Sequence, residues 1–232
     1  RLNKRFSNFY KNVIKEEEDC KKYLIQNRNI KSTYKDNSSL RYITDFAKYP
    51  VTCNNKVDYY SLGDYSYEVM LEELNKAKKF IFLEYFIIAP GKFWDSILEI
   101  LERKVNEGVE VRIIYDDLGC YTSLPSNYYK KLEKIGIKCI PFNKIKLFRG
   151  IIMNNRDHRK ILVIDGKVAF SGGINIADEY INELERFGHW KDNGIMLQGT
   201  GVKNMTILFL EMWNVFSKNK IEVFENYVTL SN

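Results

Sequence analysis

The sequence predicts an α/β fold with a mixed, largely parallel central sheet flanked by helices on both faces. Short apolar runs alternate with segments of helical period from residue 66 onward, which is the rhythm of strand–helix–strand units. The run 161–164 is apolar on both faces, as the central strand of a covered sheet is. With 232 residues, the chain is long enough to bury a sizeable core.

The first 65 residues lack this rhythm. Residues 3–29 are charged and helix-prone without a firm apolar stripe, so we expect a peripheral helix or arm there. Residues 30–50 are polar and irregular, and 51–63 are expected to form a short hairpin that ends at Gly63. We therefore expect an N-terminal arm (1–50), one α/β domain (51–220) and the start of a linker or tail (221–232).

The later elements follow from apolar periodicity and from glycine and proline breaks. Ser66 is expected to cap the first of these helices, and Gly108 and Gly136 to end the next two. The expected helices are 66–79, 93–106, 126–135 and 202–216. The expected strands are 80–89, 109–115, 137–142, 161–164, 168–171 and 194–198, with a tight turn at Asp165-Gly166.

Composition limits the functional classes. Hydrophobic residues make up 45% of the chain and charged residues 28%, as in globular proteins, and the longest apolar run, FIFLEYFIIA, is too short to cross a bilayer. The four cysteines form no Cys-x-x-Cys pair, which indicates reduced, structural thiols. With two histidines and no cluster at ligand spacing, we expect no metal and no cofactor. The net charge of +6 favours an anionic partner.

The most informative segment is RDHRKILVIDGKVAFSGGIN, residues 156–175. A strand places residues i and i+2 on one face, so the side chains of His158 and Lys160 are expected to project side by side. A nucleophilic nitrogen beside a fixed cation suits attack on a phosphodiester, because the cation neutralises the non-bridging oxygens. Asp165 completes the candidate catalytic set, but its place at a tight turn indicates a structural role in which it bonds the turn backbone.

Four further residues are expected to bind the substrate phosphate: Ser171, Gly172, Gly173 and Asn175. The Asn175 amide supplies hydrogen-bond donors, and the two glycines permit a close approach of the backbone. Ser171 and the N–H groups that follow it are expected to add donors to the same pocket.

The spacing His-x-Lys, four residues, Asp, six residues, Gly-Gly-x-Asn resembles that of the phospholipase D superfamily. The flanking segments RDHRK, GGINIADEY and HWKD resemble those of bacterial cardiolipin synthases, and the resemblance runs from about residue 40 to residue 217. It implies that His158 attacks phosphorus and becomes a phosphohistidine. It also implies that Asp192, in the segment HWKD, is the carboxylate that orients the nucleophile.

Five other features have simpler interpretations. His189 is expected to be a surface histidine, and Asp116 and Asp117 to belong to loop structure after a parallel strand. Glu84, alone in an apolar strand, needs a buried partner, either in the floor of the site or on a lysine or arginine. The segment 142–155 mixes cations with apolar side chains, and is expected to be either a partly buried connection or a lip that touches anionic lipid.

The resemblance implies a phosphatidyltransferase that converts two phosphatidylglycerol molecules to cardiolipin and glycerol. The alternatives are a phosphodiesterase or nuclease of the same fold, or a non-catalytic module that binds anionic lipid. The expected partners are phosphatidylglycerol and a membrane surface rather than nucleic acid. The resemblance also implies a second His-x-Lys motif, in another half-domain beyond Asn232 or in a second copy of the chain, and a location at the cytoplasmic face of the cell membrane, with membrane helices upstream.

Overall fold

The computed structural model describes residues 2–24, 37–145 and 155–228. The described chain forms two compact units: residues 57–197 make up one, and residues from 1–56 and 198–232 make up the other. The division into 1–50, 51–220 and 221–232 stays a prediction. The candidate site residues all belong to the unit 57–197.

The central sheet has seven strands in the order β1-β7-β6-β5-β2-β3-β4. Their bounds are β1 (Asn55–Tyr60), β2 (Phe80–Tyr85), β3 (Glu110–Asp116), β4 (Lys138–Phe142), β5 (Lys160–Ile164), β6 (Val168–Gly172) and β7 (Gly194–Gly199). The pairs β2–β3 and β3–β4 are parallel, whereas β2–β5 and β5–β6 are antiparallel. The mixed α/β sheet predicted from the sequence is confirmed, while the hairpin expected at 51–63 is instead the single strand β1.

The register brings several strand ends to one edge of the sheet. Because β5 is antiparallel to β2, with Tyr85 opposite Lys160, the start of β5 lies beside the end of β2. The ends of β3 and β4 lie on the same side, since both strands are parallel to β2. Ile161 pairs with Ser171, so β6 ends there too. We call this edge the site edge.

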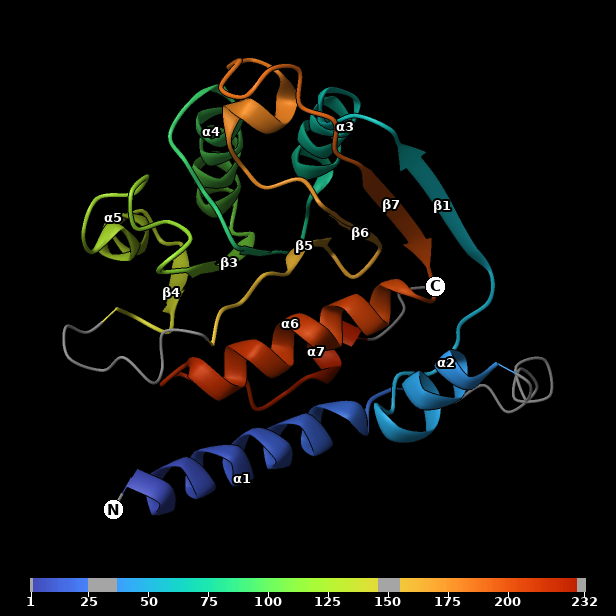
Figure 1. The fold of residues 1–232 in the computed structure, drawn as a ribbon. Coiled ribbons are helices and arrows are strands. Elements are labelled where there is room, and N and C mark those ends of the chain that lie inside the picture. The colour runs from blue at the N-terminus through green and yellow to red at the C-terminus, as the bar shows by residue number, and fades with distance from the viewer. Residues whose placement is uncertain (1, 25–36, 146–154, 229–232) are drawn as a thin grey trace. The chain divides into compact units, whose positions relative to one another are not determined.

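Helices α3 (Gly63–Lys76) and α4 (Lys92–Asn106) pack against each other beside the sheet, and α5 (Tyr128–Lys134) packs against β4 (Figure 1). The prediction that Ser66 caps a helix is wrong. The helix α3 starts three residues earlier, at Gly63, and Ser66 is buried inside it. A small residue is needed at 63, because a side-chain Cβ there would lie 1.9 Å from the carbonyl oxygen of Tyr180.

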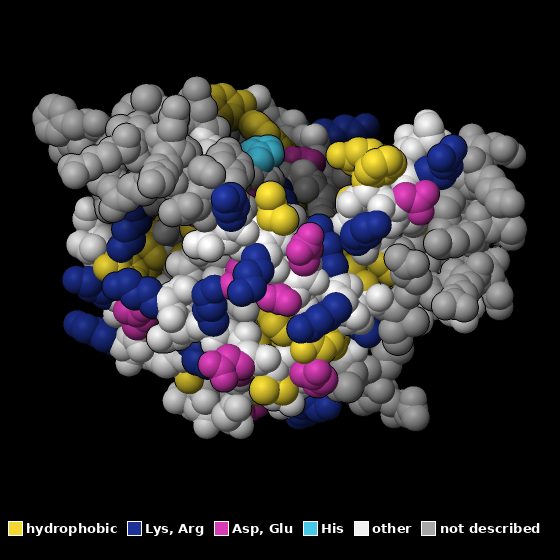
Figure 2. Space-filling model, turned by 90° about the horizontal axis from the view of Figure 1, so that it is seen from below, with side chains coloured by type: hydrophobic (Ala, Val, Ile, Leu, Met, Phe, Trp, Pro, Cys, Tyr) yellow, Lys and Arg dark blue, Asp and Glu magenta, His cyan; other side chains and the backbone are white. Residues whose placement is uncertain are grey.

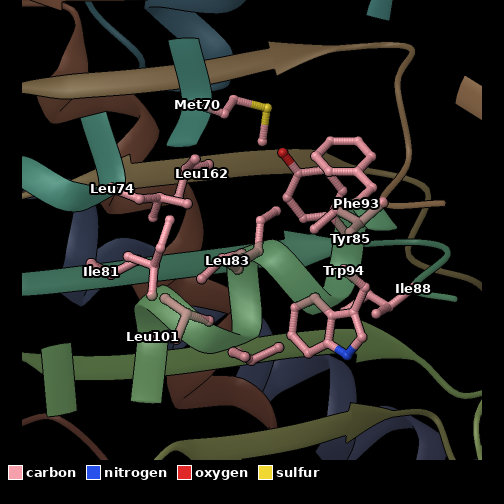
Figure 3. Packing of buried hydrophobic residues seen from close by; sticks show 14 of the residues in the cluster. Met70, Leu74, Ile81, Leu83, Tyr85, Ile88, Phe93, Trp94, Leu101 and Leu162 are labelled. Atoms are coloured by element: carbon pink, nitrogen blue, oxygen red, sulfur yellow. The ribbon is translucent and has the colours of Figure 1, made fainter. Parts of the chain in front are cut away.

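The hydrophobic core of this unit lies between α3, α4 and the sheet. Figure 3 shows Leu74 and Met70 of α3 and Trp94 and Leu101 of α4 close to side chains of β2 and β5. The indole N–H of Trp94 donates to the Tyr128 hydroxyl at 2.8 Å, so the one polar group of this buried ring is satisfied. Burial of this apolar surface is the main term that stabilises the sheet.

The start of α4 is capped by a residue far away in the sequence. The Asp178 carboxylate, in the 3-10 helix η4 (Asp178–Ile181), accepts from the backbone N–H of Lys92 at 3.0 Å and of Phe93 at 2.8 Å. Gly91 has φ +149°, and a Cβ at this position would lie 2.4 Å from Asp178 Oδ2. Glycine therefore lets the carboxylate approach the helix dipole.

The other unit is mainly helical. It contains α1 (Leu2–Lys21), α2 (Ser38–Arg41), the π-helix η2 (Tyr42–Phe46), α6 (Val202–Phe216) and α7 (Glu225–Val228). The Tyr49 hydroxyl donates to Glu211 Oε2 of α6 at 2.6 Å, and the Asn214 side chain exchanges two hydrogen bonds with the backbone of Ile221. No helix in the described ranges is long and apolar enough to cross a membrane.

Candidate active site at one edge of the sheet

The side chains of His158 and Lys160 lie at the site edge, and both lie near the Phe86 ring. The His158 imidazole is exposed, and its centroid lies 4.8 Å from that of Phe86. Lys160 Nζ lies 5.5 Å from the Phe86 centroid and donates to the carbonyl oxygen of His158 at 2.8 Å. His158 itself precedes β5, which begins at Lys160. The structure thus presents an accessible imidazole close to a fixed ammonium group.

The Lys160 ammonium is held largely out of water. Only 5% of the residue is exposed, and burial lowers its pKa, although the nearby carboxylates of Asp192 and Asp157 oppose this shift. A cation in such a place is poorly solvated, so an incoming anion is attracted strongly. The buried ammonium group of Lys160 therefore favours an anion at the site edge. On the face shown in Figure 2, by contrast, basic and acidic side chains are interspersed.

The two glycines accommodate the chain that precedes β7. A Cβ on Gly173 would lie 2.0 Å from Asp192 Oδ1, and a Cβ on Gly172 would lie 2.3 Å from the carbonyl oxygen of Asn193. The Gly173 N–H donates to that same carbonyl at 3.0 Å. The two glycines do allow a close approach, as predicted, but the group that approaches them is the protein segment 192–193 and not a phosphate. The Gly173 N–H already donates to the Asn193 carbonyl oxygen.

Asp192 is half-buried against Gly173, and its Oδ1 accepts from the backbone N–H of Asn193 at 2.8 Å. Within the described ranges, the His158 ring makes no hydrogen bond to it. The carboxylate instead acts through its charge on Lys160, where it partly opposes the lowering of the pKa by burial. Its role in orienting the nucleophile stays a prediction, as does phosphate binding by Ser171, a half-exposed residue of β6.

Asn175 lies inside the protein, in contrast to the expected amide that faces a phosphate. Only 2% of the residue is exposed. Its Oδ1 accepts from the backbone N–H of Ile87 at 3.0 Å, and its Nδ2 donates to the Tyr180 hydroxyl at 2.8 Å. Because Ile87 follows β2 closely, Asn175 ties the end of β6 to the end of β2 and supports the site edge from within.

Asp165 lies at the other end of β5 from Lys160, away from the site edge. It has φ +53°, and its carboxylate accepts three backbone N–H bonds, from Lys78 at 2.8 Å, Lys79 at 2.7 Å and Phe80 at 2.9 Å. The structural role inferred from its turn position fits this arrangement. The partners differ from those expected, however, because they belong to the segment that enters β2 rather than to the turn itself.

Asp116 contributes more than the loop role expected from the sequence. It is fully buried at the end of β3, where Oδ1 accepts from the backbone N–H of Leu118 and Gly119, both at 2.9 Å. Its Oδ2 accepts from the N–H of Asp157 at 2.9 Å, next to His158. An aspartate at the end of a buried parallel strand was the available signal, but its partner lies too far along the chain to be inferred.

The segment between η4 and β7 forms a closed loop beside the site. The Asn182 side chain accepts from the backbone N–H of Trp190 at 2.7 Å and donates to its carbonyl oxygen at 3.1 Å. His189 is exposed on this loop, as expected, and Phe187 and Leu184 are 71% and 54% exposed. The loop therefore presents apolar side chains to the outside.

No three His, Cys, Asp or Glu side chains of the described chain come together as ligands for a metal ion. Of the segment 142–155, residues 146–154 lie outside the described residues, so the predicted lipid-contacting lip is not part of this description.

Sequence comparison relates this arrangement to known proteins. The sequence model of the family described as "Cardiolipin synthase, PLD-like domain" matches residues 70–213. The chain is 36% identical over 176 residues to a cardiolipin synthase of Oceanobacillus iheyensis, a match that covers 76% of this chain and 36% of the relative. It is 53% identical over 189 residues to an uncharacterized protein of Streptococcus mutans, with 82% and 41% covered. The chain thus spans about two fifths or less of the length of these relatives.

Solved structures with low sequence identity share the fold. Nuc from Salmonella typhimurium, a phospholipase D family member, has a TM-score of 0.52 at 18% identity, with 72% of this chain and 99% of that chain covered. Phosphatidylserine synthase from Haemophilus influenzae has a TM-score of 0.54 at 13% identity, with 74% and 41% covered. With its His-x-Lys pair at the site edge, this chain belongs to the family of cardiolipin synthase phospholipase D-like domains.

Proposed function

We propose that this chain carries the nucleophilic half of a cardiolipin synthase, in which His158 accepts a phosphatidyl group and passes it to an alcohol. The observation that supports this most is the accessible His158 ring beside the buried ammonium of Lys160, joined through the 2.8 Å hydrogen bond to the His158 carbonyl. Family membership makes a phosphodiester the natural electrophile.

In the first step, a ring nitrogen of His158 attacks the phosphorus of phosphatidylglycerol. A P–N bond forms as the P–O bond to glycerol breaks, and the leaving oxygen takes a proton from a general acid. Lys160 neutralises charge on the non-bridging oxygens. In the second step, the hydroxyl of another phosphatidylglycerol loses its proton to the group that acted as the acid, its oxygen attacks phosphorus, and the P–N bond breaks. The products are cardiolipin and glycerol.

The general acid is proposed to come from a second His-x-Lys motif, in another half-domain or in a second copy of this chain. Two imidazoles that share one phosphate can hold opposite protonation states at a single pH, which the two roles require. The acceptor and the donor are both lipids, so the reaction is proposed to take place at the surface of an anionic membrane, on the cytoplasmic side.

Hydrolysis is the second candidate function. The exposed imidazole favours it, because water reaches the phosphohistidine as readily as a lipid alcohol does unless another part of the protein covers the site. Nucleic-acid phosphodiesters are a less suitable substrate, because the matching family is that of cardiolipin synthase and the Oceanobacillus iheyensis relative is a cardiolipin synthase.

A trapping experiment tests the proposal. The chain is incubated with a phosphodiester that has a p-nitrophenolate leaving group and a labelled phosphorus, then quenched in alkali, where phosphohistidine survives. Such a leaving group needs no general acid, so an isolated half is expected to form the adduct. The label should persist in His189→Gln and vanish in His158→Gln. Equal labelling of both variants, or none in the unmodified chain, rules out His158 as the nucleophile.

Lipid products then separate the two functions. With vesicles of phosphatidylglycerol, transfer yields cardiolipin, whereas hydrolysis yields phosphatidic acid. The chain supplied with the second half of a relative is the appropriate sample, because the natural leaving group requires the acid. Phosphatidic acid as the sole product would replace the synthase by the hydrolase.

A further inference from the structure

A buried ionic cluster lies directly behind the His158 segment. The Glu84 side chain of β2 is fully buried, and its Oε1 lies 2.6 Å from Nη2 of Arg159. Arg159 Nε lies 3.2 Å from Oδ1 of Asp157, whose side chain is 2% exposed. The same Oδ1 accepts from the backbone N–H of Arg159 at 3.3 Å. The partner that Glu84 needed is therefore Arg159, which joins it to Asp157.

The cluster includes the residues on both sides of His158, but its ion pairs and hydrogen bonds do not involve the imidazole. Asp157 and Arg159 are the immediate neighbours of His158 in the sequence. Glu84 pairs across the sheet with Ile161, and Tyr85 pairs with Lys160, so the Glu84 and Lys160 side chains point to opposite faces. Catalytic groups and cluster thus share one short segment but lie on different sides of it.

From this placement we propose that Glu84, Asp157 and Arg159 form a buried clamp that positions the His158 imidazole from the opposite face of the sheet. They are positioning residues, and the proposal rests on the proposed role of His158 as nucleophile. Because the Glu84 side chain lies on the face opposite to that of Lys160, we infer that they act through the backbone of residues 157–160.

Neighbouring charges leave the clamp with one more carboxylate than guanidinium group. The Asp116 carboxylate lies 3.2 Å from Nη1 of Arg156, and Arg112 of β3 is engaged by Glu110 at 2.6 Å. Arg159 pairs with both Glu84 and Asp157. The two buried carboxylates share one directly paired guanidinium group, whose side chain is 33% exposed, and Lys160 acts on Asp157 only from a greater distance. Part of their negative charge is therefore uncompensated, which is costly for buried groups.

A proton on Glu84 removes that charge. Burial, and to a lesser degree Asp157, hold the Glu84 pKa well above its usual value, and Arg159 only partly opposes this. Besides the ion pair, both Glu84 oxygens and Asp157 Oδ2 have no hydrogen-bond donor in the described part of the chain. A proton on the Glu84 carboxyl group supplies the missing donor, because the resulting O–H can donate to the Asp157 carboxylate. The clamp is then a neutral acid, a carboxylate and a guanidinium group.

The charge state predicts which substitutions the clamp tolerates. Glu84→Gln keeps the shape and a hydrogen-bond donor without a charge, so it should preserve the clamp. Glu84→Ala removes the ion pair between Arg159 and β2. Arg159→Lys replaces the planar guanidinium group, which contacts Glu84 and Asp157 at once, by a single ammonium group. Both should release the His158 segment. Asp157→Asn lets Glu84 ionise against Arg159 and should retain the position of His158.

The position of the imidazole is read directly by NMR. His158 and His189 are the two histidines of the chain, so ring labelling gives two sets of signals, and His189→Gln assigns them. The ring centroids of His158 and Phe86 are 4.8 Å apart, close enough for a nuclear Overhauser effect between their protons. We expect this effect in the unmodified chain and in Glu84→Gln, and its loss in Glu84→Ala and Arg159→Lys. Glu183→Ala, at an exposed glutamate paired with Lys92, is the control.

The rate of adduct formation supplies the second readout. Glu84→Gln should stay within about twofold of the unmodified chain, whereas Arg159→Lys should lose about tenfold or more in the rate constant with little change in KM. An unchanged His158–Phe86 effect together with an unchanged rate in folded Glu84→Ala overturns the proposal. If Glu84→Ala does not fold, the same result in Arg159→Lys overturns it. Failure of the proposed function is separate: no adduct then forms in any variant, while the NMR result still decides the clamp.

Discussion

Lys160 Nζ donates a hydrogen bond of 2.8 Å to the backbone carbonyl of His158, so the cation is tied to the chain segment that carries the candidate nucleophile. The ammonium group is therefore held beside the His158 backbone, while the imidazole is exposed. An ammonium group has three donors, and one is used here, which leaves others for a phosphate oxygen. This arrangement makes Lys160 both a structural contact and an electrostatic group.

Lys160→Met should abolish adduct formation yet stabilise the fold. Burial lowers the Lys160 pKa in the folded state, so the unfolded state binds more protons as the pH falls below 10.5. Stability consequently rises with pH through that window, and the cost of the buried charge is fully present at neutral pH. Removal of the charge should add about 1 kcal/mol, or about 2–4 °C in Tm. Thermal unfolding at pH 7.5 measures this, with exposed Lys167→Met as the control; a lower Tm for Lys160→Met contradicts it.

Asp165→Ala should behave as a folding defect. It removes the acceptor of three backbone N–H bonds at the entry to β2, at a site that water partly reaches. We expect a loss of about 1–3 kcal/mol in the free energy of unfolding by urea, and a smaller loss for Asp165→Asn, which tolerates the positive φ and keeps one acceptor. The rate of adduct formation per folded molecule should be unchanged. If the rate of adduct formation per folded molecule falls in Asp165→Ala, Asp165 takes part in catalysis.

Glu84 should produce a distinctive dependence of stability on pH. Its folded-state pKa lies well above the ordinary 4.5, so the folded state binds more protons above pH 4.5, and stability falls as the pH rises through the window that starts there. Glu84→Gln removes this contribution, because glutamine does not titrate. Urea unfolding of both proteins between pH 4.5 and 8 should give a difference in stability that grows with pH in favour of Glu84→Gln. Parallel curves would show that Glu84 is ionised in the folded protein.

Gly173→Ala should displace Asp192. The added Cβ would lie 2.0 Å from Asp192 Oδ1, too close without movement of the segment before β7. We expect a loss of about 1–3 kcal/mol. In a double-mutant cycle, the loss should shrink when Asp192→Ala is already present, since the colliding carboxylate is gone. Strict additivity of the two substitutions would mean that the glycine is needed for another reason.

Sequence reasoning predicted the α/β fold and the helices and strands from 66 onward, because these follow from local periodicity and from breaks at glycine and proline. It missed the single strand β1 and the start of α3. The Gly63–Tyr180 contact that requires a small residue there joins positions more than a hundred residues apart. No local pattern carries such information.

The candidate site shows the same division. The closeness of His158 and Lys160 was predictable because only one residue, Arg159, separates them in the sequence. Asn175 was expected to face a phosphate, but the structure uses it to join β6 to β2 through Ile87 and Tyr180. The role of Asp116 at the His158 segment depends on strand order, which a single sequence does not state.

The paired hydrogen bonds between the Asn182 side chain and Trp190 fix the base of the loop next to the site. We expect the segment 183–189, between these two residues, to tolerate changes in length and side-chain chemistry without displacement of Asp192. Substitutions of the exposed Leu184 and Phe187 should therefore change the apolar surface of this loop while Asp192 keeps its place beside Gly173.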